Sequence, residues 1–329
     1  MTRPLIPSLV ALCLALPAQA GVQEALDLHI LPGLARFDEA ATEMAETAAA
    51  DCAPEAVQPA YQAAFDAWTA VGDIRIGPSE TGVLSIEFWP DTRGFTPKTL
   101  SRLIADEDPV GRDPVAFADT SIAARGLFAL DLMLYDPAYA GYAEGDYSCA
   151  LVRTITRDLA RQAGALDAAW REQYADVLTS AGAEGNATFM TEGEAVRAIY
   201  TQILTGLEFT ADNRLGRPLG TFDRPRPTRA EAWRSGRSLR NVVLDTEAAV
   251  SLARALSDTD LPATDAALER VRAEAAKVED PALQSVDDPS GRLHVEILQQ
   301  SVRSVRDAIE TEIGVRLGIT PGFNSGDGD

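Results

Sequence analysis

The segment Ala-Ala-Arg-Gly-Leu-Phe-Ala-Leu-Asp-Leu-Met-Leu-Tyr-Asp, residues 123–136, contains no turn signal, and Asp131 is the only ionisable residue between Gly126 and Tyr135. Apolar residues therefore fall on every face of the helix that this segment predicts, which is typical of a helix surrounded by other helices. An isolated buried charge is too unfavourable to persist. The segment thus predicts a helical protein in which Asp131 is buried and is paired, hydrogen-bonded or protonated.

Apolar residues recur at helical spacing along the rest of the chain as well. Pro32 and Pro54 are well placed for first helical turns. No convincing alternating series that would indicate a strand appears, so the predicted fold class is all-α. The Gly-Tyr-Ala-Glu-Gly link at 141–145 predicts two helical bundles packed into one protein, covering residues 21–145 and 146–320, followed by a tail at 321–329.

Local signals predict several boundaries. Thr191 with Glu194 and Thr228 with Glu231 form two Thr-x-x-Glu capping boxes, each of which predicts the start of a helix. The segment 81–96 is too short and too bounded by proline for a long helix. We therefore expect an ordered loop there.

The first 20 residues have the organisation of a secretory signal peptide. Arg3 precedes an apolar run at 9–16, and Ala-Gln-Ala at 18–20 provides a small-residue cleavage site. No later stretch is long and apolar enough to anchor the chain in a membrane. We expect cleavage before Gly21 and a periplasmic or secreted protein. The net charge of −21 argues against nucleic acid and anionic lipid as partners.

Cys52 and Cys149 remain after removal of this segment. An even number of cysteines in an exported protein predicts a disulfide bond between them. Two buried free thiols are the alternative.

Common catalytic and cofactor motifs are missing from the sequence. It contains no His-Glu-x-x-His, no Gly-x-x-x-x-Gly-Lys, no dinucleotide fingerprint after a strand and no Cys-x-x-Cys. With His29 and His294 as the only histidines, a histidine-rich metal cluster cannot be built.

Acids and arginines at expected helix ends and in the ordered loop are the remaining candidates for a site. They predict either a charged pocket, which would bind a cation through carboxylates or an anion through guanidinium groups, or buried ion pairs that join loops to bundles. For Asp131 we expect an arginine partner, Arg75 or Arg125, or backbone groups of residues 87–91. The candidates are Asp73, Arg75, Glu87, Asp91, Asp131 and Arg240.

A run of arginines also stands out in so acidic a chain. We expect it to neutralise acidic faces of the protein itself. The run consists of Arg217, Arg224, Arg226, Arg229, Arg234, Arg237 and Arg240.

Several short motifs, taken in order and together with the signal peptide and the helical pattern, resemble the imelysin-like family, which includes iron-regulated protein A-like proteins and carries a peptidase M75-type name. The resemblance covers essentially the whole mature chain. It implies two helical bundles, export, and an association with iron acquisition. The motifs are Arg75-Ile-Gly-Pro78, Phe88-Trp-Pro-Asp91, Tyr147-Ser-Cys-Ala-Leu151, Arg214-Leu-Gly-Arg-Pro-Leu-Gly220, Trp233-Arg-Ser-Gly-Arg-Ser238 and the terminal Gly322-Phe-Asn-Ser-Gly-Asp-Gly-Asp329.

The hallmark of that family is Gly-x-His-x-x-Glu, and Gly126 opens the matching segment here. Phe128 stands in place of the histidine and Asp131 in place of the glutamate. Loss of the imidazole removes the strongest argument for a transition-metal site or a metallopeptidase. Asp131 is the one candidate metal ligand that the motif retains, for iron or another cation.

These observations favour a non-enzymatic periplasmic binding or accessory protein for the uptake of iron or another metal. Its expected ligand is a metal or a small molecule, and its expected partners are iron-uptake proteins of the cell envelope. A structural or interaction protein without a ligand is the alternative, and a metallopeptidase comes third. The candidate ligand-binding residues are Arg75, Glu87, Asp91, Gly126, Phe128, Asp131 and Arg240.

Overall fold

The computed structural model describes residues 21–318, and every regular element within that range is helical. The prediction of an all-α fold is confirmed. The expected signal peptide and the tail at 321–329 lie outside the described residues. The α-helices are α1 (Val22–Ala25), α2 (Leu31–Ala50), α3 (Pro54–Thr69), α4 (Ser79–Ile86), α5 (Phe95–Asp106), α6 (Gly126–Tyr135), α7 (Tyr147–Ala169), α8 (Ala175–Thr179), α9 (Glu192–Phe209), α10 (Gly216–Leu219), α11 (Ser238–Leu256), α12 (Pro262–Ala275) and α13 (Pro289–Ile309).

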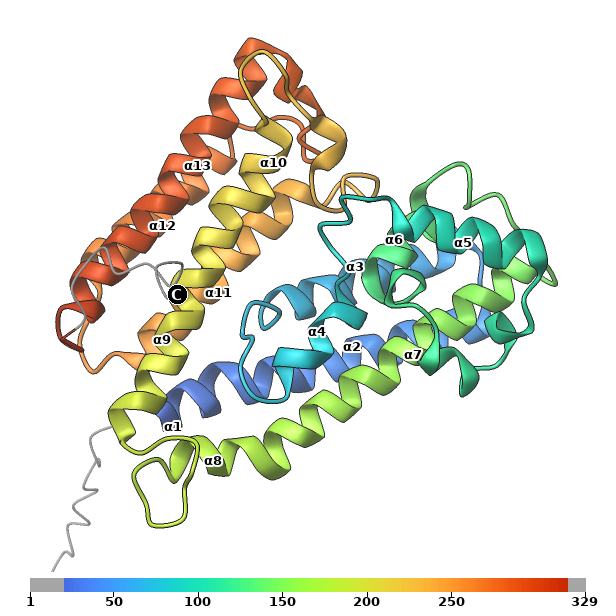
Figure 1. The fold of residues 1–329 in the computed structure, drawn as a ribbon. Helices are drawn as coiled ribbons and strands as arrows, with labels where there is room; N and C mark the ends of the chain where they lie inside the picture. The colour runs from blue at the N-terminus through green and yellow to red at the C-terminus, as the bar shows by residue number, and fades with distance from the viewer. Residues whose placement is uncertain (1–20, 319–329) are drawn as a thin grey trace, which may run out of the picture.

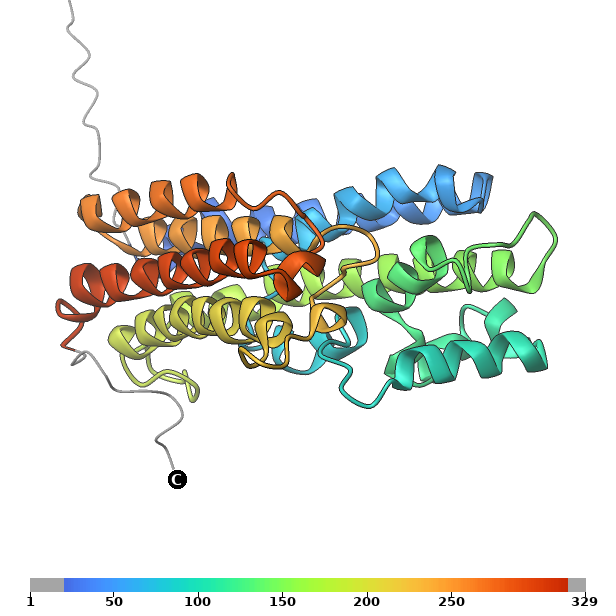
Figure 2. The same cartoon turned by 90° about the horizontal axis from the view of Figure 1, so that it is seen from above.

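Long helices that pack side by side form the body of the molecule. Helix α2 packs against both α3 and α7, and α12 packs against α13 to form a second pair (Figures 1 and 2). Helix α11 contacts α9, α12 and α3, so it lies between the second pair and the N-terminal helices. Helix α7 follows the predicted boundary at residue 145 but lies along α2, which precedes it. The division into two bundles stays a prediction.

Helix α6 is enclosed as its sequence predicts. All residues from Gly126 to Leu134 are buried, and the helix packs against α3, α5 and α7. Gly126 begins the helix with a φ of +70°, and a Cβ atom there would lie 2.2 Å from the carbonyl oxygen of Ile86. Close approach to the end of α4, together with a left-handed backbone, therefore requires glycine at this position.

The predicted disulfide is present. Cys52, in the link between α2 and α3, is bonded to Cys149 in the first turn of α7, with the two Cα atoms 5.5 Å apart. This bond ties the far end of the α2–α3 hairpin to α7. No helix among residues 21–318 is long and apolar enough to cross a bilayer.

One of the two predicted capping boxes caps a helix. The hydroxyl of Thr191 accepts a hydrogen bond from the backbone N–H of Glu194 at 3.3 Å, and α9 begins there. The second prediction is wrong. Residues 227–229 form a single 3₁₀ turn, and the next α-helix begins only at Ser238. The side chain of Glu231 has a different role, described below.

The prediction of a loop over residues 81–96 is wrong at both ends. Helix α4 extends to Ile86, and α5 begins at Phe95. The irregular segment is therefore 87–94. It connects α4 to α5 and carries two of the predicted site residues, Glu87 and Asp91.

Candidate functional site

A cavity of about 260 Å³ opens where three segments of the chain meet. One wall comes from the 88–97 segment, one from α6, and the third from residues 217–234. Three of the seven candidate ligand-binding residues line this cavity: Asp91, Phe128 and Asp131. The N-terminal and C-terminal parts of the chain thus both contribute to the cavity.

Asp131 is buried, as predicted, with 2% of its surface exposed. Its Oδ1 atom accepts hydrogen bonds from the hydroxyl of Ser235 at 2.5 Å and from the Ser235 backbone N–H at 3.2 Å, with Tyr61 Oη 3.5 Å away. The expected ion pair with Arg75 or Arg125 is wrong, and so is the expected contact with backbone groups of residues 87–91.

Burial makes the charged form of Asp131 less favourable than that of an exposed aspartate. Burial raises the pKa of this carboxyl to about 6, although hydrogen bonds from Ser235 and the charge on Arg234 oppose the shift. Within the described residues, no hydrogen bond reaches its second oxygen, Oδ2. An oxygen that can accept or donate a hydrogen bond therefore remains available on the cavity wall.

Arg125 has a different partner on α7. Its guanidinium group makes a two-point ion pair with Asp158, at 2.8 and 3.1 Å. Both side chains are buried, and Arg161 also contacts Asp158 at 2.7 Å. This buried ion pair satisfies Arg125 without Asp131.

Asp91 lies at the cavity but uses its oxygens to hold the start of α5. They accept backbone N–H hydrogen bonds from Phe95 at 2.9 Å and from Thr96 at 2.8 Å. Partial burial acts to raise the pKa of Asp91, but these hydrogen bonds outweigh it and lower the pKa below its ordinary value. The carboxylate is thus ionised and engaged with the helix N-terminus.

Aromatic rings form the apolar part of the cavity. Phe128 stacks on Trp89 with ring centres 6.2 Å apart and an interplanar angle of 15°, and it meets Phe65 edge-on at 5.7 Å. The guanidinium carbon of Arg217 lies 5.8 Å from the centre of the Trp89 ring. The side chain at the position of the family histidine is thus part of an aromatic wall.

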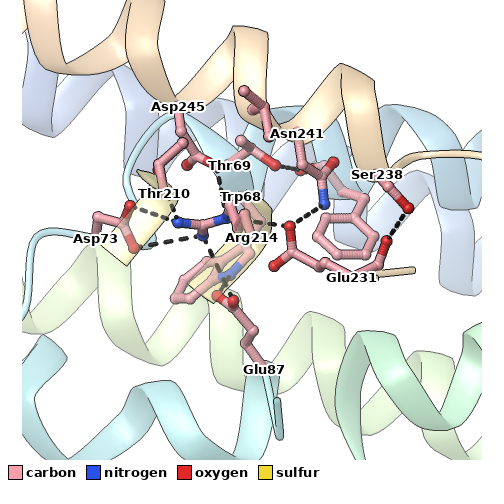
Figure 3. A network of polar contacts seen from close by, with 12 residues as sticks. Trp68, Thr69, Asp73, Glu87, Thr210, Arg214, Glu231, Ser238, Asn241 and Asp245 are labelled. Carbon is pink, nitrogen blue, oxygen red and sulfur yellow. Dashed lines mark hydrogen bonds and ion pairs between the residues drawn. The ribbon is translucent and has the colours of Figure 1, made fainter. Parts of the chain in front are cut away.

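Glu87 lies away from the cavity, in a buried network centred on Arg214 (Figure 3). Arg214 lies in a π-helical turn between α9 and α10 and is 3% exposed. Its nitrogens lie 3.0 Å from Asp73, 3.0 Å from Glu231, 2.8 Å from Asp245 and 3.7 Å from Glu87. One arginine thus faces four carboxylates.

Such an excess of carboxylates favours bound protons. Burial raises the pKa of Glu87 to about 7, against the opposing charge of Arg214, and burial raises the pKa of Asp245 well above its ordinary value. Glu87 also accepts a hydrogen bond from the indole N–H of Trp68 at 2.6 Å. The network therefore joins α3, α4 and the C-terminal helices through buried groups, and the pKa values of two of its carboxyls, Glu87 and Asp245, are raised.

The other predicted residues are also outside the cavity. Arg75 is one-third exposed and lies 3.9 Å from Asp73, with its guanidinium over the Phe209 ring. Arg240 forms an ion pair with Asp66. Gly126 contributes backbone geometry at the start of α6. The structure therefore separates the seven predicted residues into three at the cavity and four elsewhere.

Of the seven arginines in the run, three form ion pairs with acids among the described residues and four do not. Arg234 pairs with Asp136 at 2.5 Å, and both Arg237 and Arg240 pair with Asp66. The expectation that the run neutralises acidic faces holds for these three. It is wrong for the others, which make no ion pair with any described residue: Arg217, Arg224, Arg226 and Arg229.

The described residues offer one group of potential metal ligands with atoms close enough to share an ion, namely Cys52, Glu144 and Cys149. The disulfide removes both thiolates from that group. Asp131 is not a member of any such group within residues 21–318. Neither histidine lines the cavity.

Sequence reasoning missed the most connected residue, Arg214, and the roles of Glu231 and Ser235. Arg214 had a signal, because it opens one of the family motifs. The Thr-x-x-Glu spacing predicts a capping role for Glu231, whereas in the structure it accepts hydrogen bonds from Arg214 and from Asn241 at 2.9 Å. Ser235 carries no local signal for its contact with Asp131.

Comparison with known proteins identifies a family that matches most of the chain. The family model described as Imelysin (Peptidase_M75) matches residues 30–309. No curated protein sequence gives a significant match.

Two solved structures share the fold. An imelysin-like protein from Psychrobacter arcticum 273-4 is 17% identical, with a TM-score of 0.74 over 92% of this chain and 96% of the other. A putative iron-regulated protein A precursor from Parabacteroides distasonis ATCC 8503 is 13% identical, with a TM-score of 0.67 over 90% of this chain and 93% of the other.

Proposed function

The chain belongs to the imelysin family, and we propose that it is an exported, non-enzymatic binding protein that serves the uptake of iron or another metal. The observation that carries this proposal is the cavity lined by Asp91, Phe128 and Asp131. Residues of the family motif meet the C-terminal segment 217–234 there. A concave site with aromatic walls and a few polar groups is the usual form of a small-molecule site.

The identity of the residue at position 128 supports binding without metal-dependent catalysis. A metallopeptidase needs a set of protein ligands that holds the ion and activates water. Phe128 has no ligand atom, and it lies in the aromatic wall beside Trp89. Asp131 offers one oxygen, which is too few to hold a catalytic ion alone.

Export is supported by two independent features. The disulfide between Cys52 and Cys149 is of the kind that persists in oxidising compartments. The first 20 residues have the pattern of a signal peptide. The association with iron rests on the name of one structural relative, an iron-regulated protein A precursor, and on the family resemblance.

Calorimetry and metal analysis of the purified mature protein test this function. The titrants are ferrous ion under anaerobic conditions, Zn²⁺ and ferric citrate. Each is added to the wild type and to Thr228→Trp, in which a larger side chain at an exposed position of the cavity lining narrows the cavity entrance. We expect at least one titrant to bind and the variant to weaken it. Thr311→Trp, an exposed threonine that does not line the cavity, is the matched control and is expected to bind normally.

The competing functions predict other outcomes. A structural protein without a ligand would give no heat with any titrant. A metallopeptidase would cleave unfolded casein in the presence of Zn²⁺ or Fe²⁺, and a chelator would stop the cleavage. We expect no cleavage above the chelated control.

A further inference from the structure

The cavity contains two arginines with no ion-pair partner among residues 21–318, Arg217 and Arg229. Arg217 is half-buried, whereas nearly all other unpaired arginines in the described residues are exposed. Its Nε atom is buried and donates no hydrogen bond to any described group. Burial and the neighbouring charge of Arg229 both lower the pKa of Arg217. The two positive charges are therefore close enough to repel each other.

Within residues 21–318, neither acid of the cavity forms an ion pair with Arg217 or Arg229. Asp91 accepts hydrogen bonds from the backbone of α5, and Asp131 accepts its hydrogen bonds from Ser235. Arg234, the third arginine of the lining, is paired with Asp136. In a chain with 50 acidic and 29 basic residues, two arginines that meet no acid mark a place where an anion would be stabilised.

The walls favour an organic anion over a simple inorganic ion. A volume of about 260 Å³ is just below the range of roughly 300–1,000 Å³ found for small-molecule sites. Trp89 presents a ring on which Arg217 already rests, and Phe128 extends that apolar wall. The terminal nitrogens of Arg217 have no hydrogen-bond partner and are not buried, so a ligand can reach them.

We propose that the cavity binds a small organic anion with two or more carboxylate or phosphate groups, which pair with Arg217 and Arg229 while its carbon body lies against Trp89. The inference rests on the proposed function, because it assigns a ligand class to the same cavity. Such a site could serve iron uptake even if no protein side chain coordinates the metal. Ferric ion can arrive within the carboxylate shell of the anion, and the protein then recognises the shell.

Calorimetry at low ionic strength tests the proposal with four titrants: citrate, ferric citrate, inorganic phosphate and the neutral polyol sorbitol. We expect citrate or ferric citrate to bind with one site, phosphate to bind more weakly, and sorbitol to give no heat. Arg217→Gln and Arg229→Gln are each expected to weaken binding at least tenfold. Raising the salt concentration is expected to weaken binding to the wild type as well, because the contact is between charges.

Arg226→Gln is the matched control. Arg226 is also half-buried and makes no ion pair with a described residue, but it does not line the cavity. Its affinity for the anions is expected to equal that of the wild type. Circular dichroism shows whether each variant is folded, and the exposed Arg229 supplies a second test if Arg217→Gln does not fold.

Two results would overturn the inference: no heat from any of the three anions, or equal affinities in the wild type, Arg217→Gln and Arg229→Gln. Its failure can be told apart from failure of the proposed function. Binding of bare Fe²⁺ or Zn²⁺ without anion binding would refute the inference and keep the metal role. Binding of citrate and phosphate with exclusion of ferric citrate would support the inference and remove the role in iron uptake.

Discussion

Asp131 on α6 accepts two hydrogen bonds from Ser235, a residue 104 positions later in the chain, through its hydroxyl at 2.5 Å and its backbone N–H at 3.2 Å. This contact joins the enclosed helix to the segment that leads into α11. Because both donors belong to a neutral residue, the carboxyl is held without a compensating positive charge in direct contact. Asp131 therefore keeps its hydrogen bonds whether or not it carries a proton.

The first prediction concerns Asp131→Asn. The amide oxygen of Asn can accept the same hydrogen bonds, and the substitution removes the free-energy cost of burying a charged carboxylate. At pH 8 we expect the variant to be as stable as the wild type or more stable by up to about 3 kcal/mol, from a pKa shift of about two units. Urea unfolding at several pH values measures this difference.

The stability difference between Asp131→Asn and the wild type is expected to depend on pH. The folded protein holds the Asp131 proton up to about pH 6, whereas an unfolded chain releases it near pH 4. The contribution of Asp131 to stability therefore falls as pH rises through this window, and the advantage of the variant fades toward pH 4. As a matched control, Asp158→Asn leaves Arg125 buried without its partner and is expected to lose about 3–5 kcal/mol. A loss of that size in Asp131→Asn would contradict this account.

The second prediction concerns Glu87→Gln. The Gln oxygen can accept the hydrogen bond from Trp68, and Arg214 keeps three carboxylate neighbours. Burial raises the pKa of Glu87 to about 7, so the wild type loses stability from this group as pH rises from about 4.5 to 7. We expect the variant to show a shallower fall in melting temperature over that range. A steeper fall would mean that Glu87 is ionised and paired.

The third prediction concerns Gly126→Ala. A methyl group there meets the carbonyl of Ile86, and the left-handed φ is itself unfavourable for alanine. We expect a loss of at least about 2 kcal/mol in the free energy of unfolding. Gly141→Ala, where a Cβ atom meets nothing within 4 Å, should stay within about 0.5 kcal/mol of the wild type. Equal stability of the two variants would show that α6 does not approach α4 this closely.

The fourth prediction concerns the disulfide. Thiol titration of the denatured, non-reduced mature protein should find no free thiol. Replacing both Cys52 and Cys149 by serine opens a loop of 97 residues and is expected to cost on the order of 4 kcal/mol. Two titratable thiols in the untreated protein would rule the bond out.

The fold class, the enclosed helix and the cap at Thr191 could be predicted from the sequence, because each depends on a local sequence pattern. The disulfide could be predicted because an exported protein with two cysteines is expected to pair them. The sequence did not allow prediction of the partner of Asp131. Ser235 reaches that carboxyl only through the packing of distant segments, and nothing in the local sequence distinguishes it from other serines.

The second capping box failed for a similar reason. Thr228 and Glu231 have the spacing that starts a helix, but Glu231 is buried beside Arg214, and two ion-pair and hydrogen-bond partners fix its side chain there. Tertiary contacts of a charged group outweigh a capping preference of about 1 kcal/mol. The unpaired state of Arg217 could not be seen in the sequence either, because pairing depends on which acids other elements bring near.

The most direct test of the central claim, that the cavity between α6 and residues 217–234 is the ligand site, is a crystal structure of the mature protein grown with citrate. The account predicts electron density for the anion in this cavity, with a carboxylate oxygen about 3 Å from a terminal nitrogen of Arg217. Citrate bound elsewhere on the protein, with this cavity holding only solvent, would contradict it.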